Sequence, residues 1–158
     1  MKKVCLTIMT VMLAACYEPQ QNMIHHGESM PAVNLVLSDS TINWNTSNLK
    51  VGKRTMVFMF GPSCPYSRTQ MQEILDDMDD FEDTQIIAVT ISSFPQMLQF
   101  SDHYKLKKYQ NIRVGLDYRH GFQKYFQIRT VPLIAIYGPD NKLQKLFNGL
   151  TPVRRLHS

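Results

Sequence analysis

The sequence predicts a single α/β domain with a mixed but mostly parallel central sheet and helices on both faces. Two observations predict this class. Apolar runs typical of strands alternate with amphipathic segments typical of helices, an order that favours parallel strands joined by crossover helices. The last two apolar runs flank the turn at 138–141 and predict a C-terminal β-hairpin with antiparallel strands. The 158 residues are enough for one hydrophobic core.

Strands are expected where short apolar or alternating runs lie between turn residues. The run at 55–60 is continuously apolar after its first residue, which is typical of a central strand buried on both faces. The expected strands are 33–37, 41–43, 55–60, 85–91, 112–116, 131–137 and 142–148.

Helices are expected between these strands. The breaker Gly61-Pro62 and the capping residue Ser63 precede a helix over 64–80, whose apolar residues recur every three or four positions. A second helix, capped by one of two serines, is expected from 92 or 93 to 108, and a short one over 120–128. After Gly149 only LTPVRRLHS (150–158) remains, which is expected to form no more than a stub of helix.

The first fifteen residues (1–15) are expected to form a bacterial lipoprotein signal peptide. Two lysines precede an apolar stretch that is too short to span a bilayer comfortably. The stretch ends in Leu13-Ala14-Ala15-Cys16, which resembles a lipobox, so Cys16 is the expected lipidation site. Several acyl chains give stable membrane anchoring. The alternative is a plain signal peptide cleaved after Ala15.

This interpretation divides the chain into a signal peptide, an anchor with a flexible tether at 16–30, and a domain at 31–158. The tether is polar and has no periodicity. The pair His25-His26 within it is expected to be solvated rather than to bind a metal. The protein is therefore expected in the bacterial cell envelope, anchored to a membrane by lipid and facing the periplasm or the exterior.

The charge and cysteine content limit the function. The formal net charge is +4, which falls to +2 when the two lysines leave with the signal peptide. No dense basic patch with interleaved aromatic residues is present, so a nucleic-acid partner is not expected. Cys5 leaves with the signal peptide and Cys16 carries lipid. Cys64 then remains as a free thiol in an exported protein, which calls for an explanation.

Cys64 stands at the expected start of the helix that follows the strand at 55–60. The first turn of a helix has free backbone N–H groups and a positive dipole end, and both favour a thiolate. The thiolate is the form that attacks disulfides. Ser67 stands three residues later, where a C-x-x-C pair would have its second thiol.

Three blocks of sequence resemble the thioredoxin superfamily, in its exported, membrane-tethered redoxin branch. MVFMFGPSCPYSRTQM (56–71) is similar to the strand, loop, C-x-x-C and helix of that family. RTVPLIAIYGPDNKLQKLFNGLTP (129–152) is similar to its cis-proline loop and final hairpin. The lead-in strands from Pro31 form the third block.

The resemblance implies a thioredoxin-like fold and thiol–disulfide exchange, with Cys64 as the nucleophile. It implies that the Ser67 hydroxyl donates a hydrogen bond to the thiolate. A cis proline beside the sulfur would dock an extended client chain. The residues implied in substrate binding are Pro65, Tyr66, Val131 and Pro132.

This sequence departs from the family pattern where the second chemical step is concerned. Ser67 cannot expel a bound partner as a resolving cysteine would. Phe58 replaces the buried acid that relays protons in thioredoxin, and Ser63 replaces the usual Trp. The expected partners are a client protein with a disulfide or thiol and an external thiol reductant. No cofactor or metal is expected.

Three alternatives stay open. A one-cysteine peroxidase has this fold, but Gly61 stands where P-x-x-x-[ST]-x-x-C needs Thr or Ser. A copper-delivery protein would use two cysteines and a histidine, and here Arg68 replaces the second thiolate and leaves His120 as a weak candidate. A non-catalytic module could hold a client through Cys64 without turnover.

Overall fold

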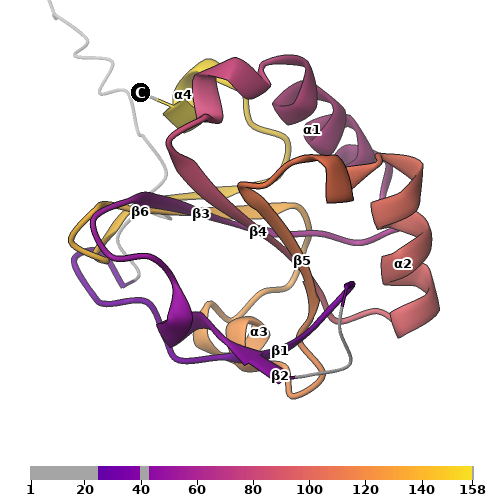
Figure 1. Ribbon diagram of the computed structural model, residues 1–158. Helices are drawn as coiled ribbons and strands as arrows, with labels where there is room; N and C mark the ends of the chain where they lie inside the picture. The colour runs from indigo at the N-terminus through magenta and orange to yellow at the C-terminus, as the bar shows by residue number, and fades with distance from the viewer. Residues whose placement is uncertain (1–24, 40–42, 158) are drawn as a thin grey trace, which may run out of the picture.

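The computed structural model describes residues 25–39 and 43–157. Within them a seven-stranded sheet has the order β2-β1-β5-β4-β3-β6-β7 and lies between helices (Figure 1). The strands are β1 (Asn34–Leu37), β2 (Asn43–Asn45), β3 (Arg54–Met59), β4 (Thr84–Thr90), β5 (Ile112–Leu116), β6 (Leu133–Tyr137) and β7 (Leu143–Asn148). The helices are α1 (Pro65–Asp76), α2 (Phe94–His103), α3 (Gly121–Tyr125) and α4 (Arg154–His157). Short 3₁₀ turns are η2 (Thr46–Asn48), η3 (Met78–Phe81) and η4 (Leu106–Lys108).

The predicted signal peptide, the lipidation site Cys16 and two residues of the strand expected at 41–43 lie outside the described residues. In the part of the chain that the structure does describe, no helix is both long and apolar enough to cross a membrane.

The predicted α/β class and mixed sheet are confirmed. Parallel pairing is limited to the three central strands, β3 with β4 and β4 with β5. The N-terminal hairpin β1–β2 and the C-terminal hairpin β6–β7 join them antiparallel, on opposite sides. The carboxyl ends of β3, β4 and β5 therefore meet at one edge of the sheet.

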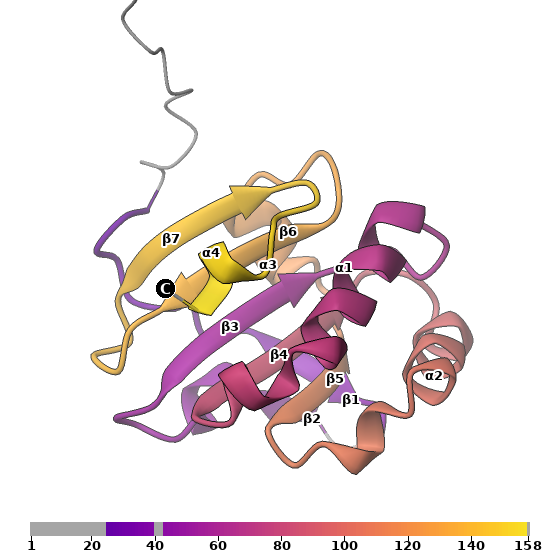
Figure 2. The same ribbon diagram turned by 90° about the horizontal axis from the view of Figure 1, so that it is seen from above.

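Both faces of the sheet are apolar, because β3 sends alternate side chains to each. Met56 and Phe58 pack in a cluster beneath α1 and α2, and Val57 and Met59 pack in a cluster beneath α3. Figures 1 and 2 show α1 and α2 on one face and α3 on the other. The prediction of a strand buried on both faces is confirmed.

Two helices end earlier than the sequence predicted. The helix expected over 64–80 stops at Asp76, and the chain continues as η3 after the non-helical Asp77. The helix expected to reach 108 stops at His103, because Lys105 takes a left-handed conformation with φ 53°. In both cases the apolar spacing continues beyond the helix into a 3₁₀ turn, so periodicity alone overstates the length.

Residues 25–30, assigned from sequence to the tether, pack on the domain. The Gly27 N–H donates to Leu143 O at 2.8 Å, and the Leu143 N–H donates to Glu28 O at 2.9 Å. The Tyr125 hydroxyl donates to Glu28 Oε2 at 2.9 Å, and His25 Nδ1 lies 2.8 Å from the same oxygen. The hydrogen bond from His25, with that from Tyr125, lowers the pKa of Glu28. Burial, with Glu28 nearby, raises the pKa of Tyr125 to about 12.

The C-terminal segment is short, as expected, and it packs against the domain. Leu156 of α4 is fully buried in the cluster beneath α1 and α2. Arg54 donates through Nη1 to His157 O at 2.8 Å and through Nη2 to Leu156 O at 2.6 Å. This single turn therefore closes the sheet face that a longer final helix would cover.

Candidate active site

Cys64 is the N-cap residue of α1, at the edge where the parallel strands end. Its backbone is extended (φ −76°, ψ 120°), and Pro65 is the first helical residue. The predicted cap Ser63 is instead an exposed loop residue, because proline favours the first helical position and so fixes the cap one residue later. The Cys64 side chain forms no capping hydrogen bond. The N–H groups in the first turn of α1 are therefore available to a bound molecule.

The loop before β6 lies directly against Cys64. The Val131–Pro132 peptide bond is cis, as the sequence predicted. The half-buried Cys64 thiol donates to Val131 O, with a distance of 3.4 Å between Sγ and the oxygen. A Cβ atom placed on Gly61 would lie 3.1 Å from Val131 Cγ2 and 3.3 Å from Cys64 Cβ. A small residue at position 61 thus lets the three segments meet.

Ser67 is buried beneath the thiol turn. It is fully inaccessible to solvent, and its Oγ accepts a hydrogen bond from the Gly61 N–H at 3.2 Å. This bond ties the helix to the loop that leads into it. The hydroxyl keeps its own proton to donate. The predicted hydrogen bond from Ser67 to a Cys64 thiolate stays a prediction.

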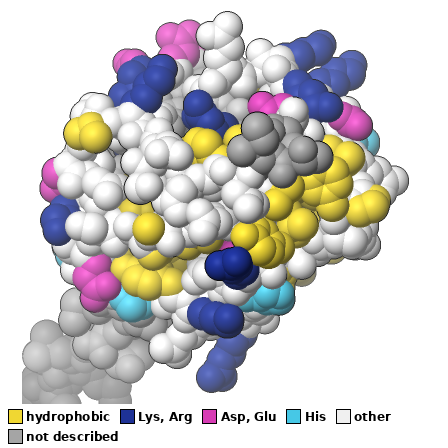
Figure 3. Space-filling view, turned by 60° about the horizontal axis from the view of Figure 1, so that its bottom comes forward, with side chains coloured by type: hydrophobic (Ala, Val, Ile, Leu, Met, Phe, Trp, Pro, Cys, Tyr) yellow, Lys and Arg dark blue, Asp and Glu magenta, His cyan; other side chains and the backbone are white. Residues whose placement is uncertain are grey.

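The surroundings of Cys64 are apolar and open. Pro65 is exposed and the Tyr66 side chain is 62% exposed. A groove of about 260 Å³ adjoins the thiol turn, and its lining comes from the ends of β3 and β4, from α3 and from the loop before Pro132. It includes Gly61, Ile91, Gln123, Ile128, Arg129 and Val131. Figure 3 turns the lower side of Figure 1 forward. On that face hydrophobic side chains gather, with Lys and Arg side chains beside them.

A model described as the AhpC/TSA family matches residues 27–146. The chain belongs to the AhpC/TSA family. No curated protein matches the chain in sequence.

Solved structures similar to this AhpC/TSA-family chain share its thioredoxin-like fold. DsbF of Mycobacterium tuberculosis is 16% identical with a TM-score of 0.68, and the match covers 80% of this chain and 90% of that one. A secreted disulfide oxidoreductase of the same organism, homologous to E. coli DsbE, is 14% identical with a TM-score of 0.62, covering 74% and 83%. Peroxiredoxin 5 of Alvinella pompejana is 16% identical with a TM-score of 0.68, covering 83% and 94%.

Metal-ligating side chains do not gather in this AhpC/TSA-family domain. Within residues 25–39 and 43–157 no group of three or more His, Cys, Asp or Glu side chains could hold an ion. His120, the histidine weighed for copper, is the N-cap residue of α3 with φ 59°. Its Nδ1 lies 2.5 Å from Gln123 Oε1. The His120 side chain thus hydrogen bonds with a residue of the first turn of α3.

Two features of the site were missed from the sequence. Ile91 and Ile128 line the groove although they lie far apart along the chain. Ile91 follows the carboxyl end of β4, which is a signal that could have placed it near Cys64. The buried Gln70 exchanges two hydrogen bonds with Thr151, at 3.0 and 2.7 Å. The sequence signal for this contact is that Gln70 is polar and lies one turn after Ser67 on the same face of the helix.

Proposed function

We propose that this protein carries out thiol–disulfide exchange outside the cytoplasm through a single nucleophilic cysteine, Cys64, while a lipid on Cys16 anchors it to a membrane. The observation that carries the proposal is the position of Cys64: a free, half-buried thiol on an uncapped helix start, beside the cis Val131–Pro132 loop. The thioredoxin-like fold supports it. The secreted disulfide oxidoreductase among the similar structures supports the extracytoplasmic location.

The first step needs only what the site holds. The Cys64 thiolate attacks one sulfur of a client disulfide, forming a mixed disulfide and breaking the client S–S bond. The departing client sulfur leaves as a thiolate and takes a proton from solvent. Free N–H groups of the first turn and the helix dipole favour the negative sulfur before attack.

The second step must come from outside, because Ser67 has no sulfur. An external thiolate attacks the Cys64 sulfur and releases the client as a thiol. A second external thiol then attacks the sulfur of the first, frees Cys64 and leaves the reductant as a disulfide. In total the client disulfide gains two electrons and two protons, and two external thiols lose them.

Substrate docking is assigned to the open surface around the sulfur. Pro65 and Tyr66 present exposed side chains on one side, and the half-buried Val131, which is followed by the buried Pro132, forms the other. The apolar groove beside Gly61 extends this surface and suits an extended client segment with apolar side chains.

The test uses the full chain with Cys5→Ser and Cys16→Ser, which leaves Cys64 as the one thiol. We expect it to react with 5,5′-dithiobis(2-nitrobenzoate) at pH 7 about ten times faster than free cysteine, as an activated thiolate does. The same chain with Cys64→Ser is the matched control. A rate no greater than that of free cysteine would reject the exchange mechanism. Mixed disulfides trapped in cells without turnover in vitro would instead favour a client-binding module.

A one-cysteine peroxidase is the second candidate, favoured by the AhpC/TSA family match and the peroxiredoxin likeness. In that reaction the Cys64 thiolate takes one oxygen from a peroxide, giving a sulfenic acid and an alcohol or water. Against it stands Gly61, which has no hydroxyl to orient the peroxide. Peroxide consumption with sulfenic acid at Cys64, faster than the disulfide reaction, would select this function.

The anchor has a separate test. The chain expressed with its N-terminus in a bacterial envelope should yield a mature protein that begins at an acylated Cys16, as read by intact mass spectrometry. Cleavage after Ala15 without an acyl group would reject lipid anchoring and leave the exchange chemistry untouched.

A further inference from the structure

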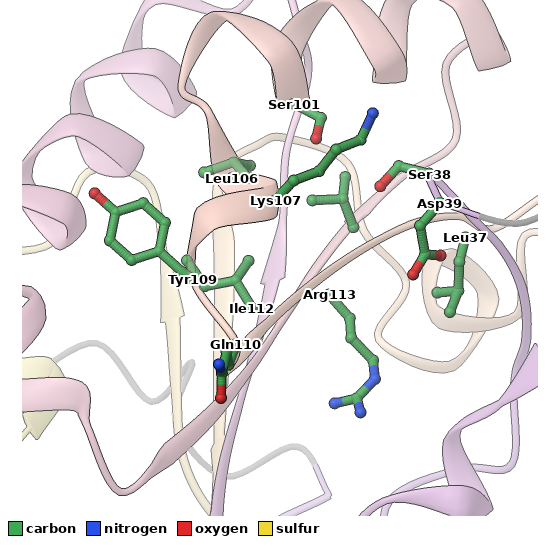
Figure 4. A pocket seen from close by; sticks show the side chains of 11 residues that line it. Leu37, Ser38, Asp39, Ser101, Leu106, Lys107, Tyr109, Gln110, Ile112 and Arg113 are labelled. Carbon is green, nitrogen blue, oxygen red and sulfur yellow. The ribbon is translucent and has the colours of Figure 1, made fainter.

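A second cavity lies at the opposite side of β5 from β4, away from Cys64. Its volume is about 340 Å³, and it is bounded by the end of β1, the last turns of α2, η4 and the first half of β5 (Figure 4). β1 pairs with β5 at Leu116 and Gly115, and the Ser38 N–H after β1 donates to Val114 O at 2.9 Å. The cavity opens where that pairing stops. Ligand cavities of small molecules begin at about this size.

A buried hydroxyl faces this cavity. Ser101 of α2 is fully inaccessible to solvent, and its Oγ has no hydrogen-bond partner among the described residues. Figure 4 shows this oxygen directed into the cavity. An unpartnered buried hydroxyl is unfavourable by about 1–3 kcal/mol. A ligand group that hydrogen bonds with Ser101 would remove that penalty.

Of the three charged residues that line the cavity, Asp39 is the one with neither a charged nor an aromatic partner among the described residues. Lys107 Nζ lies 3.5 Å from Asp102 Oδ1 and points toward α2. The Arg113 guanidinium lies 5.6 Å from the centre of the Trp44 ring and points away. Asp39, at the mouth, has no ion pair, and its carboxylate accepts no hydrogen bond within the described ranges.

Aliphatic side chains form part of the wall between mouth and floor, beside Lys107, Tyr109 and Gln110. They belong to Leu37, Leu106, Ile112 and Val114. An occupant therefore meets a carboxylate at the exposed end, aliphatic walls in the middle and a neutral hydroxyl at the buried end. A charged group is stable at the exposed mouth, whereas burying it at the floor would be costly.

We propose that this cavity binds a small aliphatic amino alcohol, with the ammonium group at Asp39 and the hydroxyl group at Ser101. The Ser38 hydroxyl, which lies beside Asp39, accepts a further N–H of the ammonium group. The methylene chain lies against Leu106, Ile112 and Val114. This site is independent of the chemistry at Cys64.

The test follows backbone amide shifts of the ¹⁵N-labelled full chain during titration with unbranched amino alcohols of three to six carbons. We expect saturable shifts at Leu106, Ile112 and Val114 for at least one chain length. The matched alkylamine, which lacks the hydroxyl, and the matched hydroxy acid, which reverses the charge, should each bind at least about threefold more weakly.

Two protein variants test where the ammonium end and the hydroxyl end of the amino alcohol bind. Asp39→Asn should weaken the amino alcohol about threefold and remove its advantage over the neutral diol, and added salt should reduce the effect. Ser101→Ala should remove its advantage over the alkylamine. Asp83→Asn, at an exposed carboxylate paired with Lys53 outside this cavity, is the control for net charge and should change nothing.

Absence of shifts at the cavity amides for the whole series would overturn the proposal. So would equal binding of the hydroxy acid, which would show an anion site built on Lys107. Asp39 is exposed, so Asp39→Asn keeps the test valid even where Ser101→Ala fails to fold.

Discussion

Helices α1 and α2 begin at neighbouring places and differ in how their first turns are satisfied. Each follows a buried parallel strand, and each has proline in its first two positions. At α2 the N–H and the hydroxyl of Ser93 both donate to Gln96 Oε1, at 3.3 and 3.0 Å. At α1 the cap is Cys64, whose side chain points to Val131 O and leaves the turn uncapped.

The difference separates a helix start that serves stability from one that leaves its thiol and N–H groups available. A good N-cap contributes about 1 kcal/mol to stability. α2 has this contribution, whereas α1 forgoes it and keeps a thiol and free N–H groups at the surface. An uncapped helix start beside an open groove is the arrangement that the proposed exchange reaction needs.

The largest expected effect comes from giving α1 a cap like that of α2. Cys64→Ser should abolish disulfide exchange, because oxygen does not attack sulfur, and should stabilise the domain by about 0.5–1 kcal/mol through a hydroxyl cap. Reaction with an aromatic disulfide and urea unfolding measure the two effects. Residual exchange in this variant would show that another group is the nucleophile.

Ser67→Cys is expected to supply the missing second step. A thiol three residues along the same helix attacks the mixed disulfide intramolecularly, so its lifetime should fall about a hundredfold. Stopped-flow decay of the Cys64 adduct measures it, with Ser63→Cys, at an exposed loop residue, as the control. An unchanged lifetime would mean that position 67 cannot reach the sulfur.

α3 extends the comparison to a carboxylate cap. Asp117 is fully buried and accepts from the Gly121 N–H at 2.8 Å and the Phe122 N–H at 2.9 Å. Asp117→Ala leaves both donors unpaired and should cost about 2–4 kcal/mol. Denaturant unfolding measures the loss, and Asp117→Asn should recover part of it. A loss below about 1 kcal/mol would contradict the assigned cap.

Ser93→Ala is the converse of the change at Cys64. It should lower the free energy of unfolding by about 1 kcal/mol and leave the exchange rate at Cys64 unchanged. Ser47→Ala, at an exposed turn, serves as a control for serine removal. A changed exchange rate would show that the two helix starts are coupled.

The smallest expected effect concerns the far end of α3, where His25 Nε2 lies 2.9 Å from Tyr125 O. Because the folded pKa of Glu28 is lowered, its contribution is present above its ordinary value of 4.5 and lost as the pH falls through the folded value. The folded pKa of Tyr125 is raised from 10.0 to about 12, so the stability that its hydroxyl contributes is lost as the pH rises above 10. Amide exchange at Gly27 should therefore accelerate only below about pH 4.5 and above pH 10, and Glu28→Gln should remove the acid limb. Exchange independent of pH, after correction for intrinsic rates, would contradict the assigned network.

Local signals in the sequence were enough to predict the fold and the position of Cys64 at the start of α1. The apolar run of β3, the C-terminal hairpin and the place of Cys64 at a helix start depend on neighbouring residues, and they were predicted. The ends of α1 and α2 were not, because the apolar spacing runs on into 3₁₀ turns.

Long-range packing was beyond the sequence pattern. The groove combines Ile91 with Ile128, and residues 25–30 bond to Leu143, so these contacts exist only once the sheet has formed. The family match covers 27–146 and therefore includes the last four residues of the segment 16–30 that composition assigned to a tether.

The hydrogen bond between the Cys64 thiol and Val131 O bears on the exchange reaction proposed above. A client N–H that docks on this carbonyl oxygen would meet an acceptor that the resting S–H already uses, so the two donors would share its two lone pairs. Once Cys64 forms the mixed disulfide it has no S–H, and the client N–H would be the remaining donor to this oxygen. The S–H would return only after the client has left, when the second external thiol frees Cys64.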